Sequence, residues 1–248
     1  MRRFSPTTRA ISVALLALAG WLRPLQSAAE SPEQPAPVRK ENAVLVGSSS
    51  FTQSFGHLIE GELERRGYQV TRKGVVGAGL ARPDFYDMHQ ALEELPVSRD
   101  TAAVFVYLGV NDAQAVWLYP HERGDSKLSA VPFGGKDWDS VYGRRTREFL
   151  ERICQRGARR AVVLLPVDVN RPELQHRLER IRQLQVQAAA EASCAVAVRT
   201  AGDEGRFEVA GVPTRLPDGF HMSPLGAQIV WARIEPQVLE LLEANAAP

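Results

Sequence analysis

The 248-residue sequence contains little that would bind a metal, nucleic acid or a membrane surface. Its two cysteines, Cys154 and Cys194, are too few for a disulfide scaffold and lack the C-x-x-C spacing of a thiolate zinc site. Thirty Lys and Arg residues against 29 Asp and Glu give a net charge of +1, so no sequence-wide positive field attracts nucleic acid or anionic lipid. We therefore expect no metal, no cofactor and no nucleic-acid partner.

Several common enzyme motifs are absent as well. No G-x-x-x-x-G-K-S/T loop is present, so nucleotide hydrolysis has no support. Gly74, Gly77 and Gly79 do not have the G-x-G-x-x-G spacing of a dinucleotide-binding loop. No G-x-S-x-G elbow surrounds Ser49, because Phe51 occupies the position of the last glycine. This argues against the α/β-hydrolase fold.

The N-terminal region lacks a hydrophobic run long enough to cross a bilayer. Arg2 and Arg3 precede an apolar run at 11–22, and small residues follow at 27–29, which is the order of a secretory signal peptide. The run has 12 residues, well short of the roughly 20 that span a membrane. We predict a leader over residues 1–29; the alternative is an uncleaved N-terminal anchor.

A proline-rich linker is expected over residues 30–41, because prolines alternate there with charges without periodicity. The composition of the chain, 44% hydrophobic and 24% charged, is typical of a globular domain, which we expect over residues 42–244. This domain would function in the periplasm or outside the cell, or at the membrane if the leader is retained. In an oxidising compartment Cys154 and Cys194 can form a disulfide; the alternative is a pair of buried thiols.

Short apolar runs alternate with amphipathic segments along this domain. The expected strands cover residues 43–46, 68–71, 103–108, 161–165 and 195–198. The expected helices cover residues 51–66, 84–95, 138–155 and 174–192, with a C-terminal helix that Ser223 and Pro224 begin. Strands separated by helices pair in parallel through right-handed crossovers. We therefore predict an α/β fold, a doubly wound three-layer α/β/α sandwich with about five parallel strands.

Reactive side chains occur at the predicted carboxyl ends of strands, where doubly wound sheets place their active sites. Ser49 follows the first strand at a helix start, where its hydroxyl can attack an acyl carbon while backbone N–H groups bind the oxyanion. Asp218 precedes His221 by three residues, a spacing that allows the carboxylate to orient the imidazole. Asn111, after the third strand, can donate to the same oxyanion.

Each of these residues also has a structural explanation. Ser49 can cap a helix, Asn111 can form a turn, Gly79 can be a turn residue with positive φ, and His221 can be an exposed loop residue. Their conjunction is more specific, because all of them lie at one predicted edge of the sheet.

This order of motifs resembles the SGNH hydrolase superfamily, also called the GDSL-type esterases. The family's blocks are matched by residues 47–49 (Gly-Ser-Ser), Gly79, residues 109–112 (Gly-Val-Asn-Asp) and residues 218–221 (Asp-Gly-Phe-His). The stretches GLARPDFYD (79–87), FGGKDWDSVYGRR (133–145) and PDGFHMSPLG (217–226) are similar to those of a bacterial cell-envelope branch. The resemblance covers residues 42–242.

The resemblance implies a Ser-His-Asp triad in which Ser49 is the nucleophile, His221 the general base and Asp218 its orienting carboxylate. It also implies an oxyanion hole formed by the backbone N–H groups of Ser49 and Gly79 and the side chain of Asn111.

Other residues near the expected site bear on the substrate. Ser48 stands where the family usually has aspartate, as it does in some SGNH-like partners of membrane acyltransferases. Arg82, in the second-block loop, is a candidate for binding an anionic substrate group; the alternative is a structural salt bridge. Residues 114–136 are expected to form a lid or rim over the site. Solvated helix faces are predicted for the arginines at 144, 145, 147, 177, 180 and 182.

The expected function is that of an exported serine esterase that removes a short acyl group, such as acetyl, from a carbohydrate or cell-envelope substrate. One alternative uses the same triad to transfer the acyl group to a sugar hydroxyl, with a membrane acyltransferase as partner. Another is a non-catalytic binding module, which Ser48 would favour. The sequence leaves the oligomeric state open.

Overall fold

The computed structural model describes residues 41–124, 129–203 and 205–244, which all fall within one unit of the chain, Arg39–Pro248. The leader predicted over residues 1–29 and the linker predicted over 30–41, except for Glu41, lie outside the described residues. None of the helices in the described ranges is long and apolar enough to cross a membrane.

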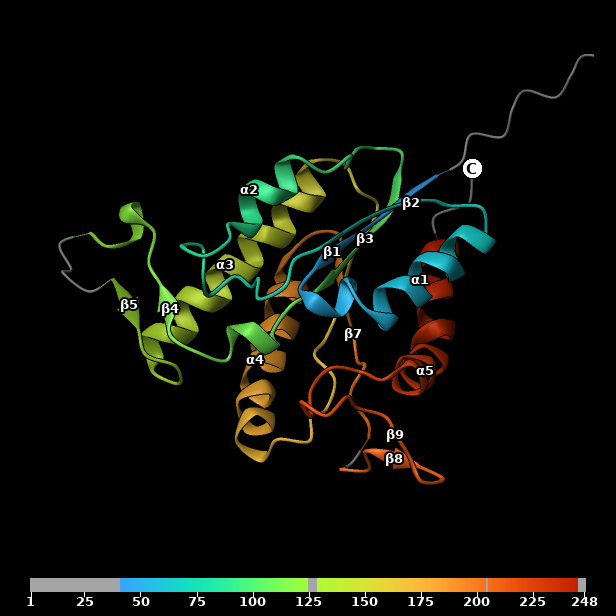
Figure 1. The fold of residues 1–248 in the computed structure, drawn as a ribbon. Helices are drawn as coiled ribbons and strands as arrows, with labels where there is room; N and C mark the ends of the chain where they lie inside the picture. Colours follow the sequence, from blue (N-terminus) through green and yellow to red (C-terminus); the bar gives the residue numbers. More distant parts are fainter. Residues whose placement is uncertain (1–40, 125–128, 204, 245–248) are drawn as a thin grey trace, which may run out of the picture. The chain divides into compact units, whose positions relative to one another are not determined.

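A five-stranded parallel sheet forms the centre of the fold (Figure 1). The strands are β1 (Asn42–Gly47), β2 (Gln69–Gly74), β3 (Thr101–Tyr107), β6 (Ala161–Leu164) and β7 (Ala195–Val198). They are arranged in the order β2-β1-β3-β6-β7, and every neighbouring pair is parallel. The strand order changes direction between β1 and β3: β2 is added on one side of β1, and the later strands are added on the other side, as in flavodoxin-like sheets. The predicted doubly wound α/β fold is confirmed.

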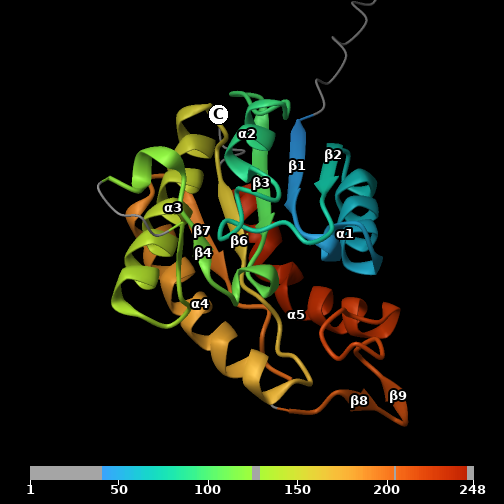
Figure 2. The same ribbon diagram turned by 60° about the vertical axis from the view of Figure 1, so that its left-hand side comes forward.

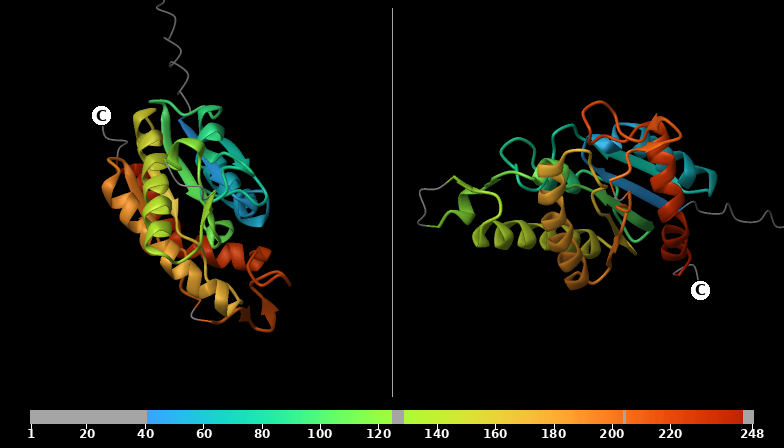
Figure 3. Two further views of the ribbon diagram at one scale, coloured as in Figure 1. Left: turned by 90° about the vertical axis from the view of Figure 1, so that its left-hand side faces the viewer. Right: turned by 90° about the horizontal axis from the view of Figure 1, so that it is seen from below.

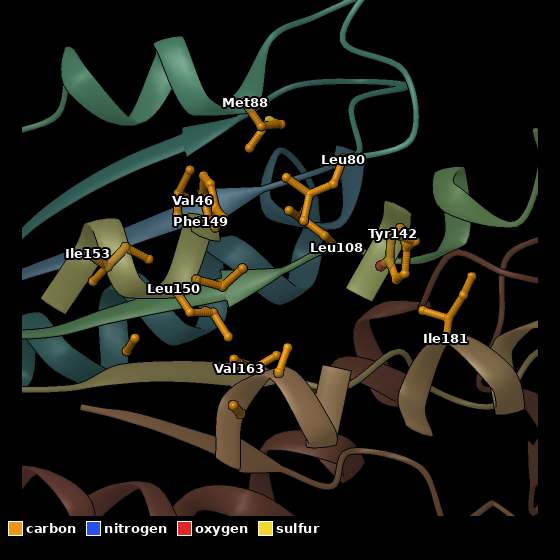
Figure 4. Packing of buried hydrophobic residues seen from close by; sticks show 14 of the residues in the cluster. Val46, Leu80, Met88, Leu108, Tyr142, Phe149, Leu150, Ile153, Val163 and Ile181 are labelled. Carbon is orange, nitrogen blue, oxygen red and sulfur yellow. The ribbon is translucent and has the colours of Figure 1, made fainter. Parts of the chain in front are cut away.

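Helices cover both faces of this sheet (Figures 2 and 3). On one face lie α1 (Ser54–Arg65) and α5 (Pro224–Glu243), and on the other lie α2 (Met88–Glu93), α3 (Lys136–Gln155) and α4 (Pro172–Glu191). Alternate residues of β1 supply the two cores, since Val44 and Val46 face α2–α4 while Ala43 and Leu45 face α1 and α5. Figure 4 shows Val46, Leu108 and Val163 of the sheet region packed against the helical side chains of the first core.

Short elements occupy the loops. The 3₁₀ helices are η1 (Ser49–Phe51), η2 (Val110–Asp112) and η3 (Pro120–Glu122). The predicted rim over residues 114–136 contains a two-stranded antiparallel sheet of β4 (Val116–Trp117) and β5 (Ala130–Val131). A second antiparallel pair, β8 (Glu208–Val209) and β9 (Val212–Pro213), precedes α5.

Two predicted helices begin later in the chain than expected. The helix expected over residues 51–66 begins at Ser54, because η1 and a turn come first. The helix expected over residues 84–95 is reduced to α2, because the Asp87 side chain accepts hydrogen bonds from the N–H groups of His89 (2.9 Å) and Gln90 (3.2 Å) and so caps a later start. The start predicted for α5 is confirmed, since the Ser223 hydroxyl accepts from the Gly226 N–H at 3.1 Å.

Cys154 and Cys194 are disulfide-bonded, which decides between the two alternatives for this pair. The bridge joins the last turn of α3 to the residue before β7. It therefore lies at the amino end of β7, away from the edge of the sheet where the reactive side chains were expected.

Arg145 is buried, so the solvated face predicted for it is wrong. Its side chain is 1% exposed, and its guanidinium pairs with the Glu122 carboxylate and donates to the Leu80 carbonyl at 2.8 Å. Burial acts to raise the pKa of Glu122, but hydrogen bonds from Arg145 and Arg144 outweigh it and lower that pKa to about 2. This ion pair joins η3 to α3 and to the loop after β2.

Candidate active site

Ser49 lies directly after β1, as the first residue of η1. The strand ends at Gly47, where a Cβ atom would lie 2.3 Å from the Tyr107 carbonyl oxygen of β3, so only glycine allows this close approach. The Ser48 N–H donates to the same carbonyl at 3.1 Å. These contacts turn the chain sharply at the carboxyl end of β1, which is the lower end of that strand in Figure 2, and Ser49 follows this turn.

Ser49, His221 and Asp218 form a continuous hydrogen-bonded chain. The Ser49 Oγ lies 2.6 Å from Nε2 of His221, although the two residues are 172 positions apart. Nδ1 of the same imidazole lies 2.7 Å from Oδ2 of Asp218. With Nδ1–H donating to the carboxylate, Nε2 carries the lone pair that faces the Ser49 hydroxyl.

The Asp218 carboxylate is fixed by its own turn. Its Oδ1 accepts from the N–H groups of Phe220 and His221, both at 3.0 Å, and Gly219 supplies the positive φ of +80° that the turn requires. Burial acts to raise the pKa of Asp218, but these bonds and the hydrogen bond from His221 hold it below its ordinary value. The carboxylate therefore stays ionised beside the imidazole.

A buried arginine connects this turn to two neighbouring loops. Arg215, 5% exposed, donates from Nε to the Asp168 carbonyl at 2.9 Å and pairs with the carboxylate of Asp203. Its backbone forms a bridge with Met222, directly after His221. Sequence reasoning missed Arg215, since nothing local marks an arginine whose carboxylate partner lies in another loop.

Gly79 and Asn111 lie together beside the triad's edge of the sheet. The Asn111 amide donates to the carbonyl of Ala78 at 2.9 Å, which uses one of its two N–H bonds. The Gly79 N–H makes no hydrogen bond within the described ranges, and the Ser49 N–H, in the first turn of η1, has no intrahelical acceptor. These groups are available to a bound oxyanion.

Asp112 supports the loop that carries Gly79. Its carboxylate is fully buried, and Oδ1 accepts from the Ala81 N–H at 2.7 Å while the Tyr142 hydroxyl lies 3.3 Å from Oδ2. Burial raises the pKa of Asp112 to about 6. In the sequence, Asp112 is marked only as the last residue of the matched block at 109–112.

Arg82 forms a structural ion pair. Its Nε and Nη2 atoms each lie 2.8 Å from the Asp84 carboxylate, and its guanidinium lies 5.3 Å from the ring centroid of Trp117. The structural salt bridge given as the alternative for Arg82 is therefore present. The binding of an anionic substrate group by Arg82 stays a prediction. Ser48, 3% exposed, is the N-cap residue of η1, yet its hydroxyl makes no capping bond.

No group of three or more His, Cys, Asp or Glu side chains in the described part of the chain is arranged to hold a metal ion. The chemistry that the arrangement supports directly is nucleophilic attack by the Ser49 hydroxyl.

Comparison with known proteins identifies the family. The model of the DUF459 family, described as a protein of unknown function, matches residues 43–237. No curated protein matches the sequence.

Several solved structures have the same fold. An acetyl xylan esterase from Geobacillus stearothermophilus is 16% identical, with a TM-score of 0.51 over 79% of this chain and 93% of that one. A carbohydrate esterase of family 3 from Talaromyces cellulolyticus is 13% identical, with a TM-score of 0.54 over 83% and 100%. A member of the lipolytic G-D-S-L family from Veillonella parvula is 14% identical, with a TM-score of 0.54 over 79% and 96%. The chain therefore belongs to the DUF459 family, and its fold is that of the SGNH hydrolase superfamily.

Proposed function

We propose that this protein is a serine esterase that removes a short acyl group, such as acetyl, from a hydroxyl of a carbohydrate or cell-envelope substrate. The observation that carries the proposal is the 2.6 Å contact between the Ser49 Oγ and the His221 Nε2, with Asp218 bound to the other side of the imidazole. A serine hydroxyl is a weak nucleophile until a neighbouring base takes its proton. The contact places such a base in reach.

In the acylation step the Ser49 Oγ attacks the carbonyl carbon of the ester, and its proton passes to His221 Nε2. The ionised Asp218 carboxylate stabilises the resulting imidazolium. The carbonyl oxygen becomes an oxyanion, for which the N–H groups of Ser49 and Gly79 and the Asn111 amide are the donors. Breakdown of the tetrahedral intermediate breaks the bond to the alcohol oxygen, which takes the proton from His221.

In the deacylation step a water molecule attacks the acyl-serine and gives its proton to His221. The bond to the Ser49 Oγ breaks, the serine oxygen recovers the proton, and the short carboxylic acid leaves. Replacing water by a sugar hydroxyl in this step gives acyl transfer, so water exclusion and acceptor binding separate the two reactions.

Acetylated carbohydrate is the substrate class that the fold relatives support, since two of the similar structures are an acetyl xylan esterase and a carbohydrate esterase. The disulfide between Cys154 and Cys194 supports a location in an oxidising compartment, such as the periplasm or the exterior. The leader predicted over residues 1–29 agrees with the same location.

The test is hydrolysis of an aryl acetate by the purified protein beside Ser49→Ala and His221→Ala. We expect kcat to fall by about 10³-fold or more in either variant. A fluorophosphonate label should attach to Ser49 and be absent from Ser49→Ala. Equal activity in all three proteins would reject the serine mechanism. Release of the aryl alcohol that requires an added sugar acceptor, with the acetyl group recovered on the sugar, would identify the transferase.

A further inference from the structure

Cavities adjoin the candidate active site at the loop between β6 and α4. Asn170 and Arg171 line three of them, with volumes of about 520, 710 and 330 Å³. The cavity of about 520 Å³ is lined by Ala113, residues 170–174 and Arg177, and we name it the arginine cavity. Because it is formed by loops at the carboxyl edge of the sheet, it lies on the same side of the molecule as the triad.

Side-chain contacts and chain continuity connect the arginine cavity to both sides of the triad. Ala113 follows η2, which carries Asn111. On the opposite side, the Arg171 guanidinium lies 5.7 Å from the ring centroid of Phe220, whose ring lies 4.4 Å from that of His221. A substrate with its ester at Ser49 would thus extend between these loops into the cavity.

Arg171 provides the first positive charge of this cavity. It is exposed, and its guanidinium forms no ion pair or hydrogen bond with the residues that the structure describes. In contrast, Arg82, Arg145 and Arg215 are each bound to a carboxylate. The Phe220 ring holds the guanidinium beside the site while leaving its N–H donors available for a planar anion.

Arg177 provides the second positive charge. Its Nη1 donates to the Ala113 carbonyl at 3.0 Å, and its guanidinium lies 5.4 Å from the Phe133 ring centroid. Among the described residues that line the cavity, Glu173 is the only one with a carboxylate; it lies 3.0 Å from Arg177 Nη2 and is 86% exposed. The exposed Glu173 carboxylate therefore pairs with the charge of Arg177. The positive charge of Arg171 is left without a carboxylate partner among the described residues.

We propose that the arginine cavity binds an anionic oxygen group of the substrate, a carboxylate or a phosphate, with Arg171 as the specificity-determining residue. This inference rests on the proposed esterase function and defines its substrate class as O-acylated acidic carbohydrate. A guanidinium with free donors favours such groups over neutral hydroxyls, because charge-assisted bidentate hydrogen bonds are stronger than neutral ones.

The test compares three O-acetylated probes that differ in one group: methyl glucuronoside, methyl glucoside 6-phosphate and neutral methyl glucoside. For Arg171→Gln we expect KM for an acidic probe to rise by about 10-fold or more with little change in kcat. The neutral probe should be unaffected, and Arg171→Lys should keep part of the preference. The acidic probe with the larger change identifies the group as carboxylate or phosphate.

Arg99→Gln is the matched control. Arg99 is exposed in the loop before β3, at the opposite end of the sheet, so the variant removes the same charge far from the triad. It should leave all three probes unchanged. Equal effects of Arg171→Gln and Arg99→Gln, or wild-type kinetics that do not distinguish acidic from neutral probes, would overturn the proposal.

A binding measurement separates this proposal from the esterase proposal. Ser49→Ala retains the arginine cavity, so calorimetry should detect tighter binding of the acidic probe than of the neutral one. Binding without turnover in the wild type would reject the esterase and keep the anion subsite. Turnover of all probes without a preference would keep the esterase and reject the subsite.

Discussion

A Cβ atom at Gly79 would lie 2.3 Å from Oδ1 of Asp112. The buried carboxylate thus sets the position of the loop whose Gly79 N–H is proposed to bind the oxyanion, and it does so from the block that also carries Asn111. The two halves of the proposed oxyanion hole are therefore held together by a contact that tolerates no side chain.

Gly79→Ala is expected to displace this loop and reduce kcat by about 10²-fold or more, the effect of losing one oxyanion donor. KM should change little, because the donor acts mainly in the transition state. Steady-state kinetics with an aryl acetate checks this. Gly61→Ala, in α1 with nothing within 4 Å of the added Cβ, is the control and should keep full activity. Equal kinetics in the two variants would contradict the contact's role.

Asp112→Asn is expected to change how stability depends on pH. The pKa of Asp112 is raised by burial from 3.8 to about 6 in the folded state. The protonated Asp112 side chain contributes fully to the free energy of unfolding below pH 3.8. This contribution is lost as pH rises through about 6, because the ionised carboxylate is disfavoured when buried. The free energy of unfolding of the wild type should thus fall, relative to Asp112→Asn, by up to about 3 kcal/mol between pH 4 and 7. Urea unfolding across this range measures the difference, and parallel curves would contradict it.

Arg145→Ala should destabilise the protein strongly, because it removes the buried cation from the Glu122 carboxylate, 4% exposed, and leaves the Leu80 carbonyl without its side-chain donor. Breaking a buried pair in this way costs about 3–5 kcal/mol. Arg147→Ala removes a surface arginine of the same helix, 40% exposed and paired with Glu191, and should cost less than about 1 kcal/mol. Denaturant unfolding of both variants measures the two losses in free energy of unfolding. Losses of similar size would refute the role assigned to Arg145.

Reduction of the disulfide should lower stability without altering the active site. The bridge closes a loop of 40 positions between α3 and β7, and its loss is expected to cost about 2–4 kcal/mol. Urea unfolding with and without reductant, and of the double variant Cys154→Ser/Cys194→Ser, measures this loss. Because the bridge lies at the amino end of β7, kcat at low temperature should be retained. A large loss of kcat in the folded double variant would show that the bridge supports the catalytic edge.

The local part of the fold was predictable from the sequence. Four of the five central strands are short apolar runs next to amphipathic segments, so their positions follow from the pattern alone; β2, with the sequence QVTRKG, is the exception. The start of α5 was predictable because Ser223 caps its own helix. The start of α1 was not, because Phe51 is held in η1 by packing of its ring against Tyr107, with centroids 5.7 Å apart, and Tyr107 lies in a different strand.

The candidate site was predictable only as a set of motifs. Ser49 and His221 are 172 positions apart, and their pairing depends on the strand order β2-β1-β3-β6-β7, which only the structure shows. Arg145 was assigned to a solvated face because its helix is rich in charge, whereas its partner Glu122 lies in η3, which folds over that helix. Arg171 carries no motif, and its availability is visible only once the partners of the other arginines are known.

The backbone N–H of Asn170 donates to the Gly219 carbonyl at 2.7 Å. The loop that lines the arginine cavity is thus hydrogen-bonded directly to the turn that orients the imidazole of His221, so a displacement of one loop is transmitted to the other. Natural variants that reshape residues 168–171 to accept a different sugar would also shift His221, so compensating changes in the turn at 216–219 should accompany them. Altered preference in this family would then arise through paired substitutions in the two loops.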